Sequence, residues 1–468
     1  MTAMPGDLTG RERPTFAELY TPKLLTVMRE GYGLAGLRAD MVAGLTVAIV
    51  ALPLSMAIAI ACGVSPERGL YTAIVGGFFV SLLGGSRFQV GGPAGAFIVL
   101  VMGTVQTVGV EGLILATMLS GLFMLLIGLA RLGTYIKFIP YPVTVGFTAG
   151  IGIIIFASQI KELLGLTLPG SEPGPLLPKL EMLAGALGTV NPVAVTVAGL
   201  SIVVIAACTR LKTKLPGMLV AVVLASAATA RFGLPVETIG SRFGGIPQAV
   251  PLPSLPDITA DTLLAVLPHA LSFTLLGAIE SLLSAVVADG MTGRRHRSNC
   301  ELVAQGVANI ASGLFGGFCV TGTIARTATN VRAGARGPVS GMLHALFLLG
   351  FMLLAAPLAS HIPLAALAGV LAIVSWNMIE RHAIGVLART SRGDLLVLVV
   401  TLLLTVFDDL AVGIVVGFAL GAMLFIHRMS KTVSVEARQA VGALEDVPDR
   451  FDGEREPYDA ALASDPDV

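Results

Sequence analysis

The chain has 468 residues and a formal net charge of zero; 54% of its residues are hydrophobic and 13% are charged. Because about a quarter of the residues of an ordinary soluble domain are charged, this composition excludes a soluble globular protein and indicates an integral membrane protein. The sequence has no long basic run, so nucleic acid is not expected as a partner.

Residues 1–40 carry charges and prolines but no apolar segment typical of a signal peptide, and we expect a cytoplasmic N-terminal segment there. Apolar stretches then recur through residues 41–431, which we expect to form the transmembrane domain. A helix needs roughly 20 apolar residues to cross a bilayer, and the alternation of a membrane barrel is not visible. We therefore predict an all-α polytopic membrane protein. Its fourteen predicted spans are 41–62, 68–84, 93–107, 111–130, 140–160, 187–208, 215–230, 264–290, 299–315, 324–333, 338–356, 363–378, 394–407 and 409–427.

The third and tenth of these spans, 93–107 and 324–333, are too short to cross a bilayer about 30 Å thick. Each follows a stretch punctuated by glycine, "QVGGPAG" and "FGGFCVTG". Short, interrupted apolar segments in corresponding places of two halves indicate a transporter with an inverted repeat and a binding site at the membrane midplane. The two repeats would cover about 41–232 and 262–430.

Lysine and arginine are distributed unequally between the two sides that this topology predicts. Segments after even-numbered spans hold Arg87, Arg131, Lys137, Arg210, Lys212, Lys214, Arg294, Arg295, Arg297, Arg332, Arg336, Arg381, Arg389 and Arg392. The other side holds Arg68, Lys161, Lys179, Arg231 and Arg242. Since cytoplasmic loops carry the excess of positive residues, both termini should be cytoplasmic.

The character of the chain changes near its C-terminal end. From Ser434 to Val468 there are ten acidic residues and three arginines. A segment this polar and short cannot bury a core, so we expect 432–468 to be a cytoplasmic linker.

The starts of the two short helices are candidate anion sites. A helix N-terminus leaves N–H groups unpaired and carries about half a positive charge, which favours an anion. Plain helix packing through glycine is the alternative interpretation. The residues predicted to build these two ends are Gly92, Pro93, Ala94 and Gly95 in the first, and Thr323, Ile324, Ala325, Arg326 and Thr327 in the second.

Arg326 and Glu280 are the charged residues placed deepest in predicted spans. An ionisable side chain at the centre of a membrane helix usually faces a cavity or a partner. Arg326 would bind an anion, with a structural ion pair or snorkelling as the alternative. Glu280 would exchange a proton or bind a cation, with Ser284 one turn further on the same face; a permanent pair with Arg326 is the alternative.

Other signatures of chemistry are lacking in the sequence. The four cysteines, Cys62, Cys208, Cys300 and Cys319, lie far apart in or beside apolar segments. We find no nucleophile, histidine and acid arrangement, no metal-ligand spacing and no phosphate loop. We therefore expect neither an enzyme nor a cofactor or metal site.

Three long motifs of the chain, residues 40–97, 280–338 and "PVTVGFTAGIGIIIFASQIKELLGL", resemble the SulP (sulfate permease) family of anion transporters. The resemblance runs from about Asp40 to Lys431. It implies a 7+7 inverted repeat folded into core and gate domains that move in an elevator-like way. It also implies an anion site between the amino ends of the third and tenth helices, with a contribution from the first.

Carried over by position, the family's site residues fall at Gly92 to Ala94 and at Ala325 to Thr327. The family's acidic position in the eighth helix, a sodium-linked Asp in a bicarbonate-transporting relative, is Glu280 here, which favours coupling to H⁺ over Na⁺. The first helix reads "PLSMAI", so Leu54 stands where many members have Gln. Members of the family usually continue into a cytoplasmic STAS domain, and residues 432–468 would form only the linker that leads to it. We expect that this domain is truncated here; a member that naturally lacks the domain is the alternative.

These features lead to one expected function and several alternatives. We expect a secondary active transporter of small anions, sulfate first, that works by proton symport in a bacterial inner membrane. A symporter of C4-dicarboxylates such as fumarate or succinate, a bicarbonate symporter, and an anion channel or exchanger are the alternatives. The expected partners are a small inorganic or carboxylate anion and the lipid bilayer; the oligomeric state stays open, with a homodimer as one alternative.

Overall fold

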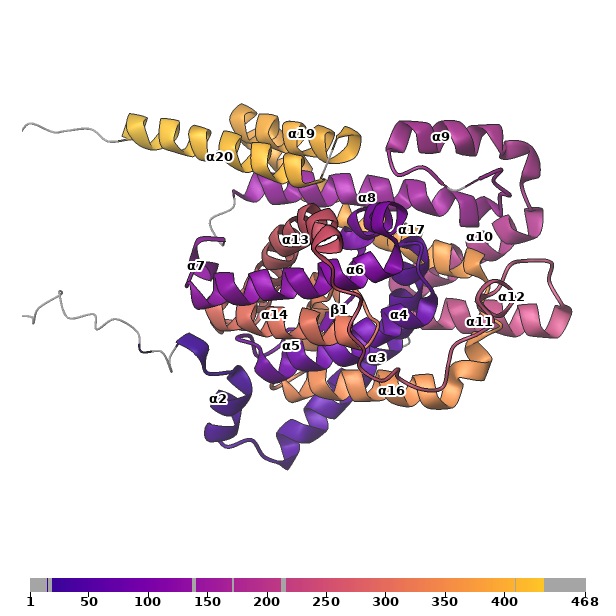
Figure 1. Ribbon diagram of the computed structural model, residues 1–468, viewed down its shortest axis with the longest axis horizontal. Coiled ribbons are helices and arrows are strands. Elements are labelled where there is room, and N and C mark those ends of the chain that lie inside the picture. Colours follow the sequence, from indigo (N-terminus) through magenta and orange to yellow (C-terminus); the bar gives the residue numbers. More distant parts are fainter. Residues whose placement is uncertain are drawn as a thin grey trace, which may run out of the picture. The chain divides into compact units, whose positions relative to one another are not determined.

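The structure is a computed structural model that describes residues 15, 19–136, 140–170, 172–211, 216–408 and 410–432. The predicted linker 432–468 lies almost wholly outside the described residues, as does most of the stretch before residue 19. The chain divides into two compact units, Met1–Ala422 and Met423–Val468, and the description below concerns the first. Helices dominate it (Figure 1), which confirms the predicted all-α class.

Each of the fourteen predicted spans coincides with a helix or a run of helices. The first half contains α3 (Leu34–Ala61), α4 (Pro66–Tyr71) continued by the π-helix η1 (Thr72–Gly76) and α5 (Gly77–Leu83), the 3₁₀ helix η2 (Gly95–Phe97) continued by α6 (Ile98–Leu129), α8 (Tyr141–Leu164), α10 (Pro192–Arg210) and α11 (Gly217–Phe232). The second half contains α13 (Ala260–Thr292), α14 (Ser298–Leu314), α15 (Ile324–Arg332), α16 (Val339–Ala359), α17 (Leu364–Met378), α18 (Arg381–Thr390), α19 (Arg392–Phe407) and α20 (Leu410–Thr432). Shorter elements are α2 (Lys23–Arg29), α7 (Gly133–Ile136), α9 (Leu176–Gly185), η3 (Leu187–Thr189) and α12 (Ile239–Phe243).

Helix α6 contains the predicted break between the third and fourth spans. Gly109 lies in its middle with φ 71° and ψ −175°, a conformation outside the helical region that side-chain-bearing residues rarely adopt. Among the described residues, seven helices are long and apolar enough to cross a membrane by length and composition. The chain is therefore a polytopic membrane protein.

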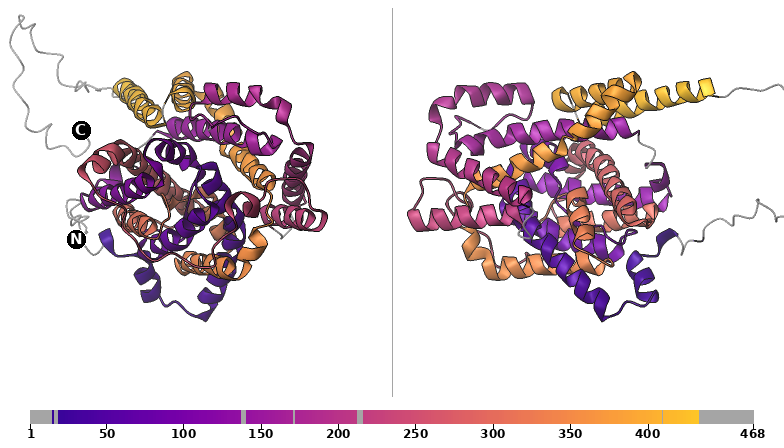
Figure 2. Two further views of the ribbon diagram at one scale, coloured as in Figure 1. Left: turned by 45° about the vertical axis from the view of Figure 1, so that its right-hand side comes forward. Right: turned by 180° about the vertical axis from the view of Figure 1, so that it is seen from behind.

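The helices pack in two groups, each drawn from both halves of the chain. In the core group, α6 packs against α13 and α14, and α3 packs against α16. In the gate group, α8 packs against α17 and α19, and α10 packs against α11 and α17. Helices of the first half, in indigo and magenta, therefore interleave with orange helices of the second half (Figure 2). These groups correspond to the core and gate domains that the family resemblance implies.

Two very short strands bring the starts of the short helices together. β1 (Gly91–Gly92) pairs antiparallel with β2 (Thr321–Gly322), and Gly91 is opposite Gly322. The Thr323 N–H also donates to the Val90 carbonyl at 3.2 Å. Because each strand runs directly into a helix start, η2 and α6 on one side and α15 on the other, this pairing fixes the position of both N-termini.

Loops that the distribution of Lys and Arg assigns to one side of the membrane are in contact with one another in the structure. The Lys23 N–H donates to the Gly84 carbonyl at 2.9 Å, and the Arg297 N–H donates to the Gly85 carbonyl at 2.9 Å. Arg87 forms an ion pair with Glu30. On the opposite side the Arg68 guanidinium donates to the Gly316 carbonyl at 2.7 Å. The predicted alternation of spans is therefore consistent with the packing.

The loop after α15 is anchored from α3. The Asp40 carboxylate accepts hydrogen bonds from the Arg336 N–H at 2.5 Å, the Gly337 N–H at 3.2 Å and the Tyr32 hydroxyl at 2.7 Å. Burial, together with the neighbouring Asp40, raises the pKa of Tyr32, so the phenol remains a donor at neutral pH. Asp40 thereby fixes the C-terminal end of α15 to the core group.

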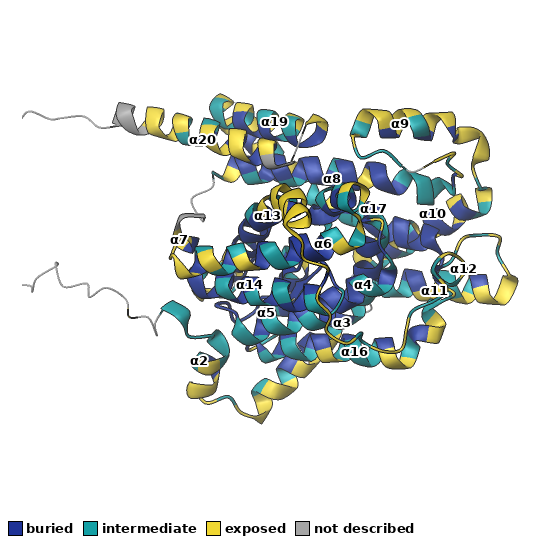
Figure 3. Ribbon diagram, viewed as in Figure 1, coloured by how far each residue is buried: buried dark blue, intermediate teal, exposed yellow. Residues whose placement is uncertain are grey.

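The outer surface of the bundle is apolar. Leu200 and Val203 on α10 are 60% and 61% exposed, and Leu354 and Leu358 on α16 are 84% and 72% exposed. Figure 3 shows the buried residues concentrated on the inner helices, among them α3, α6 and α14. Side chains of this kind on an outer face indicate contact with lipid.

The contact between α6 and α14 is close enough to require glycine. A Cβ atom at Gly306 would lie 2.6 Å from the Gly121 carbonyl oxygen, and the reverse holds for a Cβ atom at Gly121. We expect Gly306→Ala to lower the free energy of unfolding by about 1–3 kcal/mol, because two helix backbones must separate. Thermal unfolding of purified protein in detergent measures this.

Gly350→Ala on α16 is the matched control, since a Cβ atom there would meet nothing within 4 Å. Its melting temperature should stay at or slightly above that of the wild type. Equal melting temperatures for Gly306→Ala and the wild type would contradict the packing described for α6 and α14.

Candidate functional site

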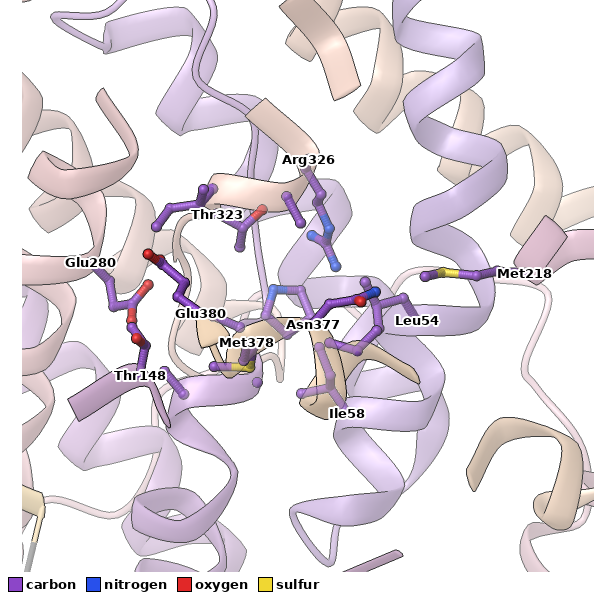
Figure 4. A pocket seen from close by; sticks show the side chains of 17 residues that line it. Leu54, Ile58, Thr148, Met218, Glu280, Thr323, Arg326, Asn377, Met378 and Glu380 are labelled. Carbon is purple, nitrogen blue, oxygen red and sulfur yellow. The ribbon is translucent and has the colours of Figure 1, made fainter. Parts of the chain in front are cut away.

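A cavity of about 270 Å³ lies where the two helix starts meet α3, α13 and the gate group (Figure 4). Nine of the residues predicted from the sequence line it: Leu54, Pro93, Ala94, Gly95, Glu280, Thr323, Ile324, Ala325 and Arg326. The structure thus brings together side chains separated by more than 200 residues in the sequence. Their contact with an anion remains a prediction.

Both helix starts lack a side-chain cap. α15 begins after Thr323, whose hydroxyl forms no cap and instead donates to the Val90 carbonyl at 3.5 Å. The 3₁₀ helix η2 begins after Ala94, whose methyl group cannot cap. The first N–H groups of a helix have no intrahelical acceptor, so both ends present donors and partial positive charge at the cavity.

Arg326 supplies the full positive charge of the site. Its side chain is 2% exposed, and Figure 4 shows the guanidinium pointing into the cavity. One terminal nitrogen donates to the Ser55 hydroxyl at 3.0 Å, and the other donates to the Gly91 carbonyl at 3.4 Å. Its Nε has no hydrogen-bond partner among the described residues. A guanidinium has five N–H donors, so this one keeps donors for a further acceptor.

Gly92 has a different place from the one predicted. It does not line the cavity; a Cβ atom at this position would lie 1.4 Å from the Arg326 Nη1 atom. The prediction treated Gly92 as an anion contact because glycine admits a ligand close to the backbone. In the structure the space left by the missing side chain is occupied by the guanidinium instead.

Glu280 lies on α13, is 7% exposed and lines the same cavity as Arg326. The described residues contain no ion pair between these two side chains or between Glu280 and any other cation. The alternative of a permanent Glu280 and Arg326 pair is therefore not seen. The Glu280 carboxyl group therefore lines the cavity and is accessible to an ion that enters it.

Ser284 and Thr327 are also placed away from the cavity. Both are fully buried, and the Ser284 hydroxyl donates to the Thr327 hydroxyl at 3.0 Å. Thr327 in turn accepts from the Val90 N–H at 3.2 Å. These bonds join α13, α15 and the strand β1, because one face of α13 packs against α15. The geometry gives the pair a structural role where the sequence predicted a ligand.

Sequence reasoning missed the side of the cavity that the gate group supplies. The residues concerned are Thr148, Met218, Val374, Asn377, Met378 and Glu380; Ile58 on α3 and Ala96 on η2, which belong to the core group, were also missed. Most are ordinary members of apolar spans, and no periodicity separates them from packing residues. Glu380 was detectable as an acid following an apolar span, but such residues usually face solvent. Among the described residues, His, Cys, Asp and Glu form no group that could hold a metal ion.

Comparison with known proteins gives consistent matches. Residues 37–401 match the sulfate permease family. The putative sulfate transporter YvdB of Bacillus subtilis is 43% identical over 88% of this chain and 77% of its own length. The bicarbonate transporter BicA of Picosynechococcus is 34% identical over 88% of this chain and 74% of its own length. The solved transmembrane domain of a cyanobacterial BicA superposes with a TM-score of 0.72, at 33% identity, over 84% of this chain and 98% of that one.

The position of Ser284 leads to a prediction that separates stability from binding. Ser284→Ala removes one buried hydrogen bond and should lower the free energy of unfolding by about 1 kcal/mol. Because Ser284 does not reach the cavity, the concentration of anion that gives half-maximal uptake should not change. Thermal unfolding and transport measured on one preparation test both statements; a large loss of anion affinity with unchanged stability would contradict this placement.

Proposed function

This chain belongs to the sulfate permease family, and we propose that it is a secondary active anion transporter that carries sulfate together with protons. One observation carries the proposal: a buried guanidinium with unused donors lies in a cavity beside two uncapped helix starts. A buried charge is costly unless it is paired. A transported anion would supply that counter-charge for part of the cycle.

The size and charge of the cavity suit a small anion. A volume of about 270 Å³ admits sulfate, bicarbonate or a short dicarboxylate. Sulfate ranks first because the chain is 43% identical to YvdB, a putative sulfate transporter. Bicarbonate ranks second because the chain is 34% identical to BicA. Since Leu54 stands in place of a polar residue, the preference among these anions would depend on the backbone N–H groups and Arg326. A C4-dicarboxylate such as fumarate is the third substrate to test.

Glu280 would couple the anion to a cation. When ionised, it adds a negative charge to the cavity and opposes an anion there; when protonated, it does not, so anion and proton would bind together. A sodium ion needs several oxygen ligands, and Ser284, one helical turn from Glu280, does not line the cavity. This supports proton coupling over sodium coupling.

The position of the cavity between the two helix groups supports an elevator-like cycle. η2, α6, α13 and α15 provide Arg326, Glu280 and the helix starts, whereas α8, α11 and α17 provide the facing wall. If the core group slides against the gate group, the whole binding surface moves with it and is exposed to the other side. An anion channel would instead conduct without such a shift and without protons.

The excess of Arg and Lys on one set of loops supports a bacterial inner membrane location with both termini in the cytoplasm. Arg87 and Arg297 belong to this set, and their loops lie together with α2 of the N-terminal part.

Arg326→Ala should weaken anion binding while the protein still folds. Losing a charged donor of this kind should raise the anion concentration for half-maximal uptake about tenfold or more. Arg332→Ala, which removes an exposed arginine of the same helix, is the matched control and should behave like the wild type. Unchanged affinity in Arg326→Ala would remove Arg326 from the site.

Glu280→Gln should abolish concentrative uptake driven by a proton gradient and leave anion exchange between the two sides intact. Proteoliposomes are loaded with sulfate, fumarate or bicarbonate in turn, and a proton or a sodium gradient is imposed. Glu111→Gln, an exposed glutamate of α6, is the control. If Glu280→Gln still concentrates the anion with the proton gradient, Glu280 is not the coupling group. Unitary currents through the wild type would favour a channel.

A further inference from the structure

Asn377 and Glu380 lie between two spaces. Both line the cavity of about 270 Å³, and both also line a neighbouring groove of about 650 Å³. The groove is formed by the end of α17, by α18 and by the starts of α8 and α19. We call the position of Asn377 and Glu380 the neck, because these two residues line both the groove and the cavity that holds Arg326.

Glu380 occupies the N-cap position of α18 without capping it. Its backbone has φ −71° and ψ 67°, and its side chain accepts no hydrogen bond from the first turn of α18. The carboxylate points into the cavity instead (Figure 4), and the hydroxyl of Tyr141, which lines the groove, donates to it at 3.4 Å. An acidic side chain is stabilised when it caps a helix start, so this orientation forgoes a favourable interaction.

The carboxylate of Glu380 also has no ion pair among the described residues. The adjacent Arg381 stacks on the ring of Trp376, with 4.4 Å from its guanidinium carbon to the ring centre. The negative charge at the neck is therefore not neutralised by its nearest arginine. The titratable and charged groups that line the groove or the cavity with Glu380 are Tyr141, Arg381, His382, Asp394, Glu280 and Arg326.

We propose that Glu380 is a specificity-determining residue that controls anion entry at the neck by its charge. This inference rests on the proposed function, since it requires that an anion passes between the groove and the cavity. The negative charge of the Glu380 carboxylate repels an approaching anion, and removing that charge would let the anion enter more readily. Doubly charged anions are repelled more strongly than singly charged ones, so the neck also discriminates between them.

Glu280 and Glu380 then have separate roles in the same cavity. Glu280 is 7% exposed on α13 of the core group and would move with the bound anion. Glu380 follows α17 in the gate group and is exposed toward the groove. A proton on Glu280 would be carried with the anion, whereas the charge of Glu380 stays with the gate and alters only how readily the anion enters.

The test is sulfate uptake into proteoliposomes by the wild type and Glu380→Gln, with the apparent KM measured at external pH 8. We expect Glu380→Gln to have an apparent KM at pH 8 about three- to tenfold below that of the wild type. Its proton-driven accumulation should be retained. Glu380→Asp keeps the charge and should retain the wild-type KM at pH 8, and Glu181→Gln, an exposed glutamate of α9, is the matched control.

The outcomes separate the two proposals. If the wild type takes up none of sulfate, fumarate and bicarbonate, the proposed function is wrong, and the proposal for Glu380 fails with it. If the wild type transports sulfate and Glu380→Gln has the same KM at pH 8, the proposal for Glu380 is overturned while the proposed function stands. A higher KM in Glu380→Gln would also overturn it, because Glu380 would then contribute to binding instead of repulsion.

Discussion

Arg326 places a positive charge, 2% exposed, inside a helical bundle whose outer surface faces lipid, and no acidic side chain among the described residues pairs with it. A charge in that position is tolerated only where polar groups or a mobile counter-ion offset it. The Ser55 hydroxyl and the Gly91 carbonyl offset it partly. Its Nε has no hydrogen-bond partner among the described residues, and the proposed chemistry of the site follows from this incomplete pairing.

The strand pair β1 and β2 makes this arrangement stable. Irregular backbone is tolerated at membrane depth only where its N–H and C=O groups find partners. Here Gly91 pairs with Gly322, and Val90 is bonded to both Thr323 and Thr327. The backbone that interrupts the two short helices is thus satisfied by its counterpart in the other repeat. The first N–H groups of each helix start have no intrahelical acceptor, and we propose that they bind the anion.

The core and gate groups contribute different chemistry to the one cavity. The core group carries Arg326 and the two helix starts, which favour an anion, and Glu280, which is proposed to exchange a proton. The gate group carries Thr148, Asn377 and Glu380, among which the carboxylate opposes an anion. Attraction on the proposed moving part and repulsion on the proposed fixed part would make anion entry depend on the charges of both groups of helices.

The sequence by itself determined the class of protein, the positions of the fourteen spans, the break near Gly109 and the two interrupted helices. These follow from local composition: long apolar runs must be helical in lipid, and glycine marks where the backbone departs from a helix. Arg326 and Glu280 stood out for the same reason, because a charge in an apolar run is costly and therefore conspicuous.

Only the tertiary structure decided which of the predicted residues reach the cavity. Gly92 makes room for a guanidinium more than 200 positions away, and Ser284 is bonded to Thr327 and does not line the cavity. The residues that the gate group contributes to the cavity, Glu380 among them, could not be predicted for a related reason. Whether a side chain faces a cavity, a neighbouring helix or solvent depends on how segments distant in the sequence pack together, and local composition contains no information about that contact.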